Sequence, residues 1–136
     1  MIEEFTHKYL DEVYRLGRTL NSNFNNLYDE QSLNCGVNKT ILYIMDSTLI
    51  GFLHFQLISD EIDVISLVID NDYRNKGYAT ELLNYLEKLY FGRRITLEVS
   101  EVNIAAINLY TKCGFKEIGR RKGYYSGIDA IIMEKK

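Results

Sequence analysis

The chain has 136 residues, which is enough for one domain of ordinary size, expected to cover residues 1–136, and too few for two. It is 46% hydrophobic and 26% charged, as soluble globular proteins are, and its formal net charge of -3 disfavours a nucleic-acid partner, because phosphate binding favours a strongly basic face. No apolar run approaches the roughly 18 residues of a membrane span, and the acidic N-terminus lacks the basic-then-apolar pattern of a signal peptide. We therefore expect a cytoplasmic protein with no membrane partner.

Cysteine and histidine are too scattered in the sequence to indicate a metal site. Cys35 and Cys113 have no paired cysteine or histidine at ligand spacing, so we predict no bound metal and two free thiols. His7 and His54 are isolated, and His54 lies in an apolar run that is typical of a strand. For both histidines, a packed or surface side chain is the simpler interpretation.

The first half of the chain predicts one helix and then three strands. Apolar residues recur at helical spacing between Tyr9 and Leu20, and an Asn-rich loop or a few short helical turns follow at Asn21–Asn26. The hydrophobic pattern then changes to that of strands, which are predicted at Thr40–Asp46, Leu49–Ile58 and Ile62–Ile69. The short polar turns between these strands indicate an antiparallel meander.

The second half alternates helices with strands. The predicted elements are a helix at Gly77–Tyr90, a strand at Ile95–Val99, a helix at Ile104–Cys113, the segment Phe115–Arg120, and, after a loop, a last strand at Ala130–Glu134. Gly114 stands where a left-handed helix cap is expected. Together the two halves predict an α/β (α+β) fold with a single mixed sheet and helices on its faces.

The segment from Tyr73 to Thr80 joins an apolar strand to an amphipathic helix, and this context favours phosphate binding. The start of a helix offers unpaired backbone N–H groups and the positive end of the helix dipole. Gly77 lets a ligand approach the backbone closely, and Arg74 and Lys76 add positive charge. The glycine spacings of a P-loop and of a dinucleotide-binding turn are both absent. On this segment alone, an ordinary polar loop is an equal alternative.

Two motifs in order give the chain a family resemblance. The pattern R-x-x-G-x-A at Arg74–Ala79 resembles the pyrophosphate-binding motif of the GNAT acetyltransferases, and Leu97–Phe115 resembles that family's L-E-V…N-x-x-A-x-x-L-Y-x-x-x-G-F stretch. With the tail from Arg120 to Met133, the match is most similar to the RimI branch, the ribosomal-protein N-terminal alanine acetyltransferases. It covers roughly residues 62–135 and is weak before them. The resemblance implies a GNAT fold, with a mostly antiparallel sheet.

The resemblance also implies the site residues. Acetyl-CoA would be the co-substrate, bound at Leu67, Val68, Ile69, Arg74, Asn75, Lys76, Gly77, Tyr78, Ala79, Thr80 and Asn103. By the same resemblance, Glu98 is the general base and Tyr110 the general acid. Strand alternation by itself puts Glu98 on the opposite face from its apolar neighbours, where a solvent-facing carboxylate is the alternative.

Four further residues have open alternatives. Asn103 is a good helix N-cap by type and position, and capping alone would explain it. Glu101 is better explained as a loop or first-turn carboxylate than as a second base. The resemblance makes Tyr124 and Tyr125 candidate acceptor contacts on a loop before the last strand, although a chance pair is unsurprising among eleven tyrosines.

The acceptor is the open part of the prediction. The N-terminal third, which shapes the acceptor site in this superfamily, lacks the aromatic-Pro-Trp segment of many RimI proteins, because the chain has no proline and no tryptophan. A peptide or protein N-terminus, such as that of a ribosomal protein, is the first hypothesis. A small amine is the second, and a coenzyme A-binding module without turnover is the third. The protein is expected to be a monomer or a homodimer.

Overall fold

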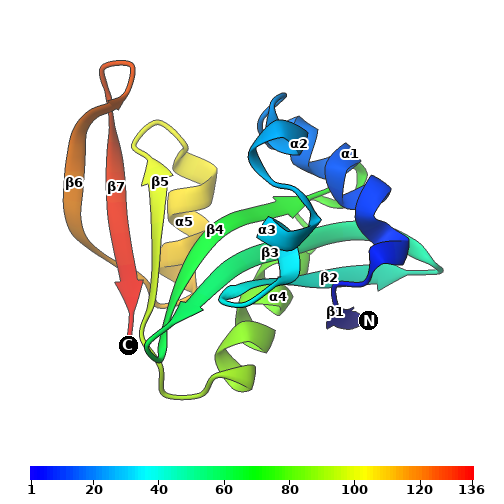
Figure 1. Ribbon diagram of the computed structural model, residues 1–136. Helices are drawn as coiled ribbons and strands as arrows, with labels where there is room; N and C mark the ends of the chain where they lie inside the picture. Colours follow the sequence, from blue (N-terminus) through cyan, green and yellow to red (C-terminus); the bar gives the residue numbers. More distant parts are fainter.

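The structure is a computed structural model that describes residues 1–136. Its strands form one seven-stranded sheet (Figure 1). The strands are β1 (Ile2–Glu4), β2 (Asn38–Met45), β3 (Thr48–Ile58), β4 (Glu61–Ile69), β5 (Ile95–Ser100), β6 (Lys116–Tyr125) and β7 (Ile128–Lys135). Their order in the sheet is β1-β2-β3-β4-β5-β7-β6, and every neighbouring pair is antiparallel except β4 with β5. The predicted mixed, mostly antiparallel sheet is confirmed.

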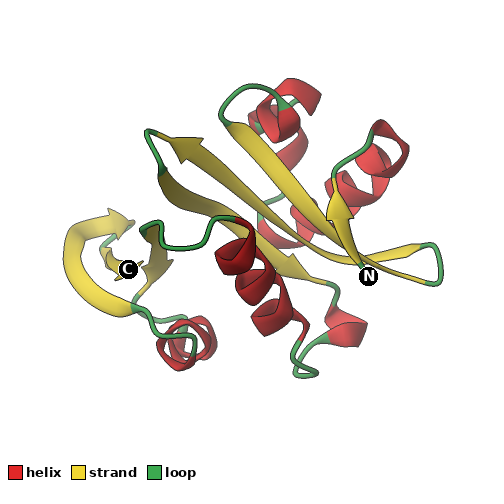
Figure 2. Ribbon diagram, turned by 90° about the horizontal axis from the view of Figure 1, so that it is seen from below, coloured by secondary structure: helices red, strands yellow, loops and turns green.

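Helices cover both faces of the sheet (Figure 2). They are α1 (Leu10–Leu20), α2 (Phe24–Leu27), α3 (Glu30–Asn34), α4 (Tyr78–Leu89) and α5 (Ile104–Lys112), with single 3-10 turns at His7–Tyr9 and Asn71–Tyr73. On one face, Val13, Phe24 and Leu33 from α1–α3 pack against strand residues in one core cluster. On the other face, Leu82 and Leu86 of α4 belong to a second cluster. None of the helices combines the length and the apolar character needed to cross a membrane.

Tight turns connect the antiparallel neighbours. Asp46 and Ser47, between β2 and β3, have φ of 51° and 63°, and Ser59 and Asp60, between β3 and β4, have φ of 49° and 68°. Two successive positive φ angles are typical of type I′ turns, whose twist matches that of a hairpin. Short polar residues tolerate this region better than bulky ones do. The polar turns predicted from the sequence therefore lie where the chain reverses.

Three elements differ from the sequence prediction. β1 is only three residues long, too short to show an alternating pattern, and α3 is a short helix that Asp29 caps by accepting a hydrogen bond from the Ser32 N–H at 2.8 Å. β6 continues to Tyr125, although a loop was predicted after Arg120. It is an edge strand with almost every side chain exposed, so it has no buried face to produce a hydrophobic period.

The isolated histidine and cysteines have simple environments. His54 is 1% exposed, and its ring donates from Nε2 to the Ser32 carbonyl oxygen at 3.0 Å. Its packed position agrees with the simpler interpretation of this residue. Cys35 and Cys113 are free thiols, as predicted.

The sheet opens between β4 and β5. The parallel pairing of these strands ends at Val64 and Leu97, whereas β4 stays paired with β3 as far as Ile69, and β5 stays paired with β7 as far as Ser100. A β-bulge at Ile65, which has no partner on β3, occurs where the two strands begin to part. The C-terminal halves of β4 and β5 therefore splay apart and leave a gap within the sheet.

Gly17 is required by the packing of α1 on α2. A Cβ atom added at Gly17 would lie 2.4 Å from the ring of Phe24, which is 1% exposed and cannot move aside. Alanine favours a helix by about 1 kcal/mol over glycine, but overpacking costs about 1–3 kcal/mol. We expect Gly17→Ala to lower the free energy of unfolding by about 1 kcal/mol or more in urea titrations. Glu12→Ala, at a half-buried position of the same helix, is the matched control, and a Gly17→Ala variant as stable as the wild type or more stable would contradict the prediction.

Candidate active site

A cavity of about 760 Å³ opens where β4 and β5 diverge. Its walls come from the C-terminal half of β4, the loop before α4, the first turn of α4, the end of α1 and one side of α5. Every residue predicted to contact acetyl-CoA lines this cavity except Lys76, and Tyr110 lines it as well. The fold thus brings together residues as far apart in the sequence as Thr19 and Lys112.

The exposed edge of β4 presents backbone amides to the gap. The Asp70 N–H donates to the Ile50 carbonyl oxygen at 2.7 Å. This bond shows which residues of β4 direct their N–H groups toward β3. Because alternate residues of an antiparallel strand bond to the same neighbour, Val68 also faces β3 with its N–H. The N–H groups of Leu67 and Ile69 then point the other way, into the gap where β5 has turned aside. They are free to donate to an extended ligand lying along β4.

The loop before α4 ends in a left-handed turn. Gly77 has φ of +88°, and a Cβ atom added there would meet nothing within 4 Å, so this side of the glycine is open to the cavity. The first intrahelical bond of α4 runs from the Glu81 N–H to the Gly77 carbonyl oxygen at 3.0 Å. The amides of Tyr78, Ala79 and Thr80 therefore have no intrahelical acceptor. Together with the helix dipole, they form a site suited to an anion.

The two basic side chains of this loop have different orientations. Arg74 donates from Nε to the Ile69 carbonyl oxygen at 3.2 Å, so it ties the loop to the end of β4 beside the cavity. The Nζ atom of Lys76 lies 5.8 Å from the centre of the Tyr73 ring, a cation–π contact, and Lys76 does not line the cavity. The structure thus groups Arg74 but not Lys76 with the other predicted cofactor contacts.

Helix α5 supplies a buried phenol and a capped N-terminus. Tyr110 is 9% exposed and packs against the Phe115 ring at 5.8 Å. Burial, and to a lesser extent Cys113, raises the pKa of Tyr110 to about 12, so its hydroxyl is protonated at neutral pH. Asn103 caps α5, because its Oδ1 accepts from the Ala106 N–H at 3.2 Å. Its side-chain amide group is still available to the cavity that it lines.

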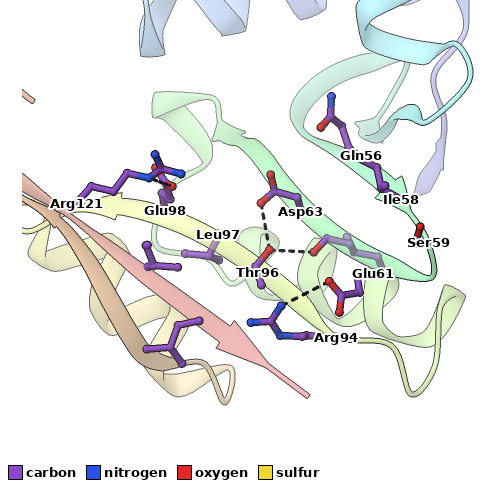
Figure 3. Close-up of a pocket in the computed structure, with 13 residues that line it drawn as sticks. Gln56, Ile58, Ser59, Glu61, Asp63, Arg94, Thr96, Leu97, Glu98 and Arg121 are labelled. Carbon is purple, nitrogen blue, oxygen red and sulfur yellow. Dashed lines mark hydrogen bonds and ion pairs between the residues drawn. The ribbon is translucent and has the colours of Figure 1, made fainter. Parts of the chain in front are cut away.

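Glu98 lies in a different cavity. Leu97 and Val99 point into the core on the α4 and α5 side, and Glu98 points to the opposite face, as the strand alternation predicted. There it lines an open groove of about 510 Å³, where the Arg121 Nε–H donates to its Oε1 at 2.6 Å (Figure 3). The Glu98 side chain is 30% exposed. Glu98 and Tyr110 thus lie on two sides of β5.

The predicted tyrosine pair, on the β6–β7 hairpin, does not line this groove. Tyr124 and Tyr125 lie at the end of β6, which corrects their predicted place on a loop, and their rings meet edge to face at 5.0 Å. The Arg121 guanidinium lies 5.6 Å from the centre of the Tyr124 ring. Burial, and then the charges of Glu98 and Tyr124, raises the pKa of Tyr125. Tyr125 is therefore within electrostatic range of Glu98.

The chain matches the model of the acetyltransferase (GNAT) family over residues 3–115. It belongs to this family. It is 36% identical over 106 residues to an N-alpha-acetyltransferase of Saccharolobus solfataricus, covering 72% of this chain and 64% of that protein, which is less than two thirds of its length. It is 35% identical over 99 residues to the ribosomal protein bS18-alanine N-acetyltransferase of Haemophilus ducreyi, covering 67% of this chain and 68% of that protein.

A solved structure extends the likeness to nearly the whole chain. The ribosomal-protein-S18-alanine N-acetyltransferase of Escherichia coli superimposes with a TM-score of 0.79 and 26% identity, covering 98% of this chain and 91% of that one. The expected GNAT fold and the resemblance to RimI proteins are confirmed by these matches. The N-terminal third, where the sequence resemblance was weak, shares the fold as well.

Sequence reasoning missed two groove residues of this GNAT chain. Asp63 and Arg121 line the groove beside Glu98. Asp63 could have been found, because the alternation that exposes Glu98 on β5 also exposes Asp63 on the polar face of β4. Glu101 instead holds a loop: its Oε2 accepts from the Asp129 N–H at 2.5 Å.

Proposed function

We propose that this GNAT chain transfers the acetyl group of acetyl-CoA to a primary amine, and that the amine is the N-terminal α-amine of a protein. The observation that carries the proposal is the cavity at the β4–β5 gap, which joins an anion-binding helix start to a strand edge with free amides. The relatives named as N-alpha- and ribosomal alanine acetyltransferases support the acceptor class.

The cavity fits an extended thioester that carries a pyrophosphate. The unpaired amides of Tyr78, Ala79 and Thr80, at the positive end of α4, suit the pyrophosphate. The outward amides of Leu67 and Ile69 suit the amide-containing arm, which can extend along β4 as an added strand would. An N–H aimed at the thioester carbonyl would stabilise the negative charge that develops on its oxygen during attack.

The acceptor would reach the thioester through the gap from the groove. Glu98 takes one proton from the acceptor ammonium, directly or through water, and gives a neutral amine. The amine nitrogen bonds to the carbonyl carbon, the carbon–sulfur bond breaks, and the nitrogen releases a second proton to water. The departing thiolate takes a proton from Tyr110, which water restores, so one proton is released for each amide formed. Because the pKa of Tyr110 is about 12, this proton donor is protonated at neutral pH.

Thiol release from acetyl-CoA tests the proposal. The purified protein is assayed with peptides of varied N-terminal residue and with small amines, and product mass identifies the acetylated nitrogen. We expect turnover on peptides that begin with a small residue such as alanine or serine. Turnover on small amines alone would exclude the peptide acceptor but keep the transfer reaction. Binding of acetyl-CoA without turnover on any acceptor would reject the transfer proposal and favour a binding module.

Gly77→Ala should weaken acetyl-CoA binding. Alanine at a positive φ costs about 1 kcal/mol wherever it occurs, and at Gly77 the new methyl group also stands in the open space before the α4 amides. We expect the KM for acetyl-CoA to rise about 10-fold or more. Gly92→Ala is the matched control, because Gly92 has φ of +81° and equally open surroundings but lies outside the cavity. An equal change in both variants would show that backbone strain alone is responsible.

A further inference from the structure

Asp63 lies beside Glu98 in the groove and has no role in the proton transfers proposed above. β4 and β5 are in parallel register at Asp63 and Thr96, so Asp63, Thr96 and Glu98 project from one face of the sheet. The Thr96 hydroxyl donates to Asp63 Oδ1 at 3.2 Å and holds the carboxylate at the floor of the groove (Figure 3).

Arg121 is the cation beside Asp63 and Glu98, and it is bonded to Glu98. Arg121 bonds to Glu98 at 2.6 Å, and Asp63 has a neutral hydroxyl as its hydrogen-bond partner. Arg94, farther along the groove, is already paired with Glu134 at 2.6 Å and with Glu61 at 3.5 Å. The end of the groove beside the gap therefore has a formal charge of -1 from Asp63, Glu98 and Arg121.

The environment of Asp63 disfavours the negative charge of its carboxylate. Although Asp63 is in contact with water, the surrounding walls desolvate it, and this desolvation raises the pKa of its carboxyl group. The hydrogen bond from Thr96 lowers this pKa, the charge of Glu98 raises it, and Arg121 lowers it, with a net upward shift. An ammonium group between the carboxylates would supply the charge that their ionised forms need.

Asp63 is also well placed along the sheet. The β4–β5 pairing ends one residue after Asp63 and Thr96, at Val64 and Leu97. The carboxylate pair thus lies at the edge of the gap through which an acceptor must reach the thioester. Leu67 and Ile69, with their outward amides, follow on the same strand, just beyond the bulge.

We propose that Asp63 and Glu98 together bind the ammonium group of the acceptor, and that Asp63 selects for a cationic amine. The inference rests on the proposed acetyltransferase function and adds a specificity-determining residue to it. Glu98 takes the proton, as above, while Asp63 holds the nitrogen by a charge-assisted hydrogen bond. An acetylated amine, which has no charge, gains nothing from Asp63.

Steady-state kinetics of Asp63→Asn with the best peptide acceptor tests this proposal. Asparagine keeps the size of the side chain and can still accept from Thr96. We expect the KM for the acceptor to rise about 10-fold or more, with the KM for acetyl-CoA within about twofold of the wild-type value. The inhibition constant of the acetylated product peptide should also stay within about twofold, because this peptide carries no ammonium.

Two more variants separate charge from structure. Asp63→Glu retains the charge and should recover part of the affinity for the acceptor. Glu61→Gln also removes a carboxylate from the groove. Because Glu61 is paired with Arg94, this variant should leave the KM for the acceptor nearly unchanged. A parallel rise in the acceptor KM and in the product inhibition constant of Asp63→Asn would overturn the inference, as would an unchanged acceptor KM. Absence of wild-type turnover on every acceptor would instead reject the proposed function, and with it this inference.

Discussion

Glu98→Gln should lower kcat about 100-fold or more, because a general base typically contributes a factor of that size. Glutamine matches glutamate in size and can still accept a hydrogen bond from Arg121, but it cannot take a proton from the acceptor. The Glu98 side chain is partly exposed, so loss of its ion pair with Arg121 should cost at most about 1 kcal/mol of stability. The measurement is kcat with a saturating peptide acceptor, together with the KM for acetyl-CoA, which should not change.

Glu101→Gln is the matched control for this variant. Glu101 lies three residues further along, but it accepts the Asp129 N–H and pairs with Arg120, so it holds the loop that follows β5. Its variant should keep kcat within about threefold of the wild-type value. Full activity of Glu98→Gln, or a greater loss in Glu101→Gln, would exclude Glu98 as the base.

The fold was predictable where local sequence carries a strong pattern. In the meander from β2 to β4, the apolar strands and the two-residue polar turns between them predict the same hairpins. In α4, an apolar stripe at helical spacing predicts the helix. β6 lacks such a signal, since an edge strand with both faces exposed has no period to detect. The gap between β4 and β5 has no local sequence pattern to predict it, because the pairing of strands distant in sequence has no local signature.

The site was predictable in its composition more than in its geometry. The motif around Gly77 identified the part of the cavity lining between Arg74 and Thr80, because its loop and the helix start form one local unit. The orientation of Lys76 toward Tyr73 could not be inferred, since it depends on packing between side chains. Arg121 was hidden for another reason: its contact with Glu98 spans 23 residues and depends on the pairing of β6 with β7 and of β7 with β5.

Tyr110→Phe should lower kcat about 100-fold while leaving the KM for acetyl-CoA nearly unchanged, because only the proton donor is lost. The ring is 9% exposed and packs on Phe115, so phenylalanine fills the same space. Tyr9→Phe is the matched control: Tyr9 is 7% exposed, lies in the other core cluster and does not line the cavity. Undiminished turnover of Tyr110→Phe would require another source for the proton of the leaving thiol.

The raised pKa of Tyr110 gives the same variant a second, independent readout. Above pH 10 the unfolded chain ionises this phenol, but the folded chain, with a pKa of about 12, retains the proton, so folding stability falls as the pH rises. Between pH 9 and pH 11 this group alone should cost the wild type about 1 kcal/mol. Urea unfolding of Tyr110→Phe should show an alkaline loss smaller by that amount. Identical alkaline slopes for the two proteins would mean that the Tyr110 hydroxyl is better solvated than its burial indicates, and would weaken the case for a protected proton donor.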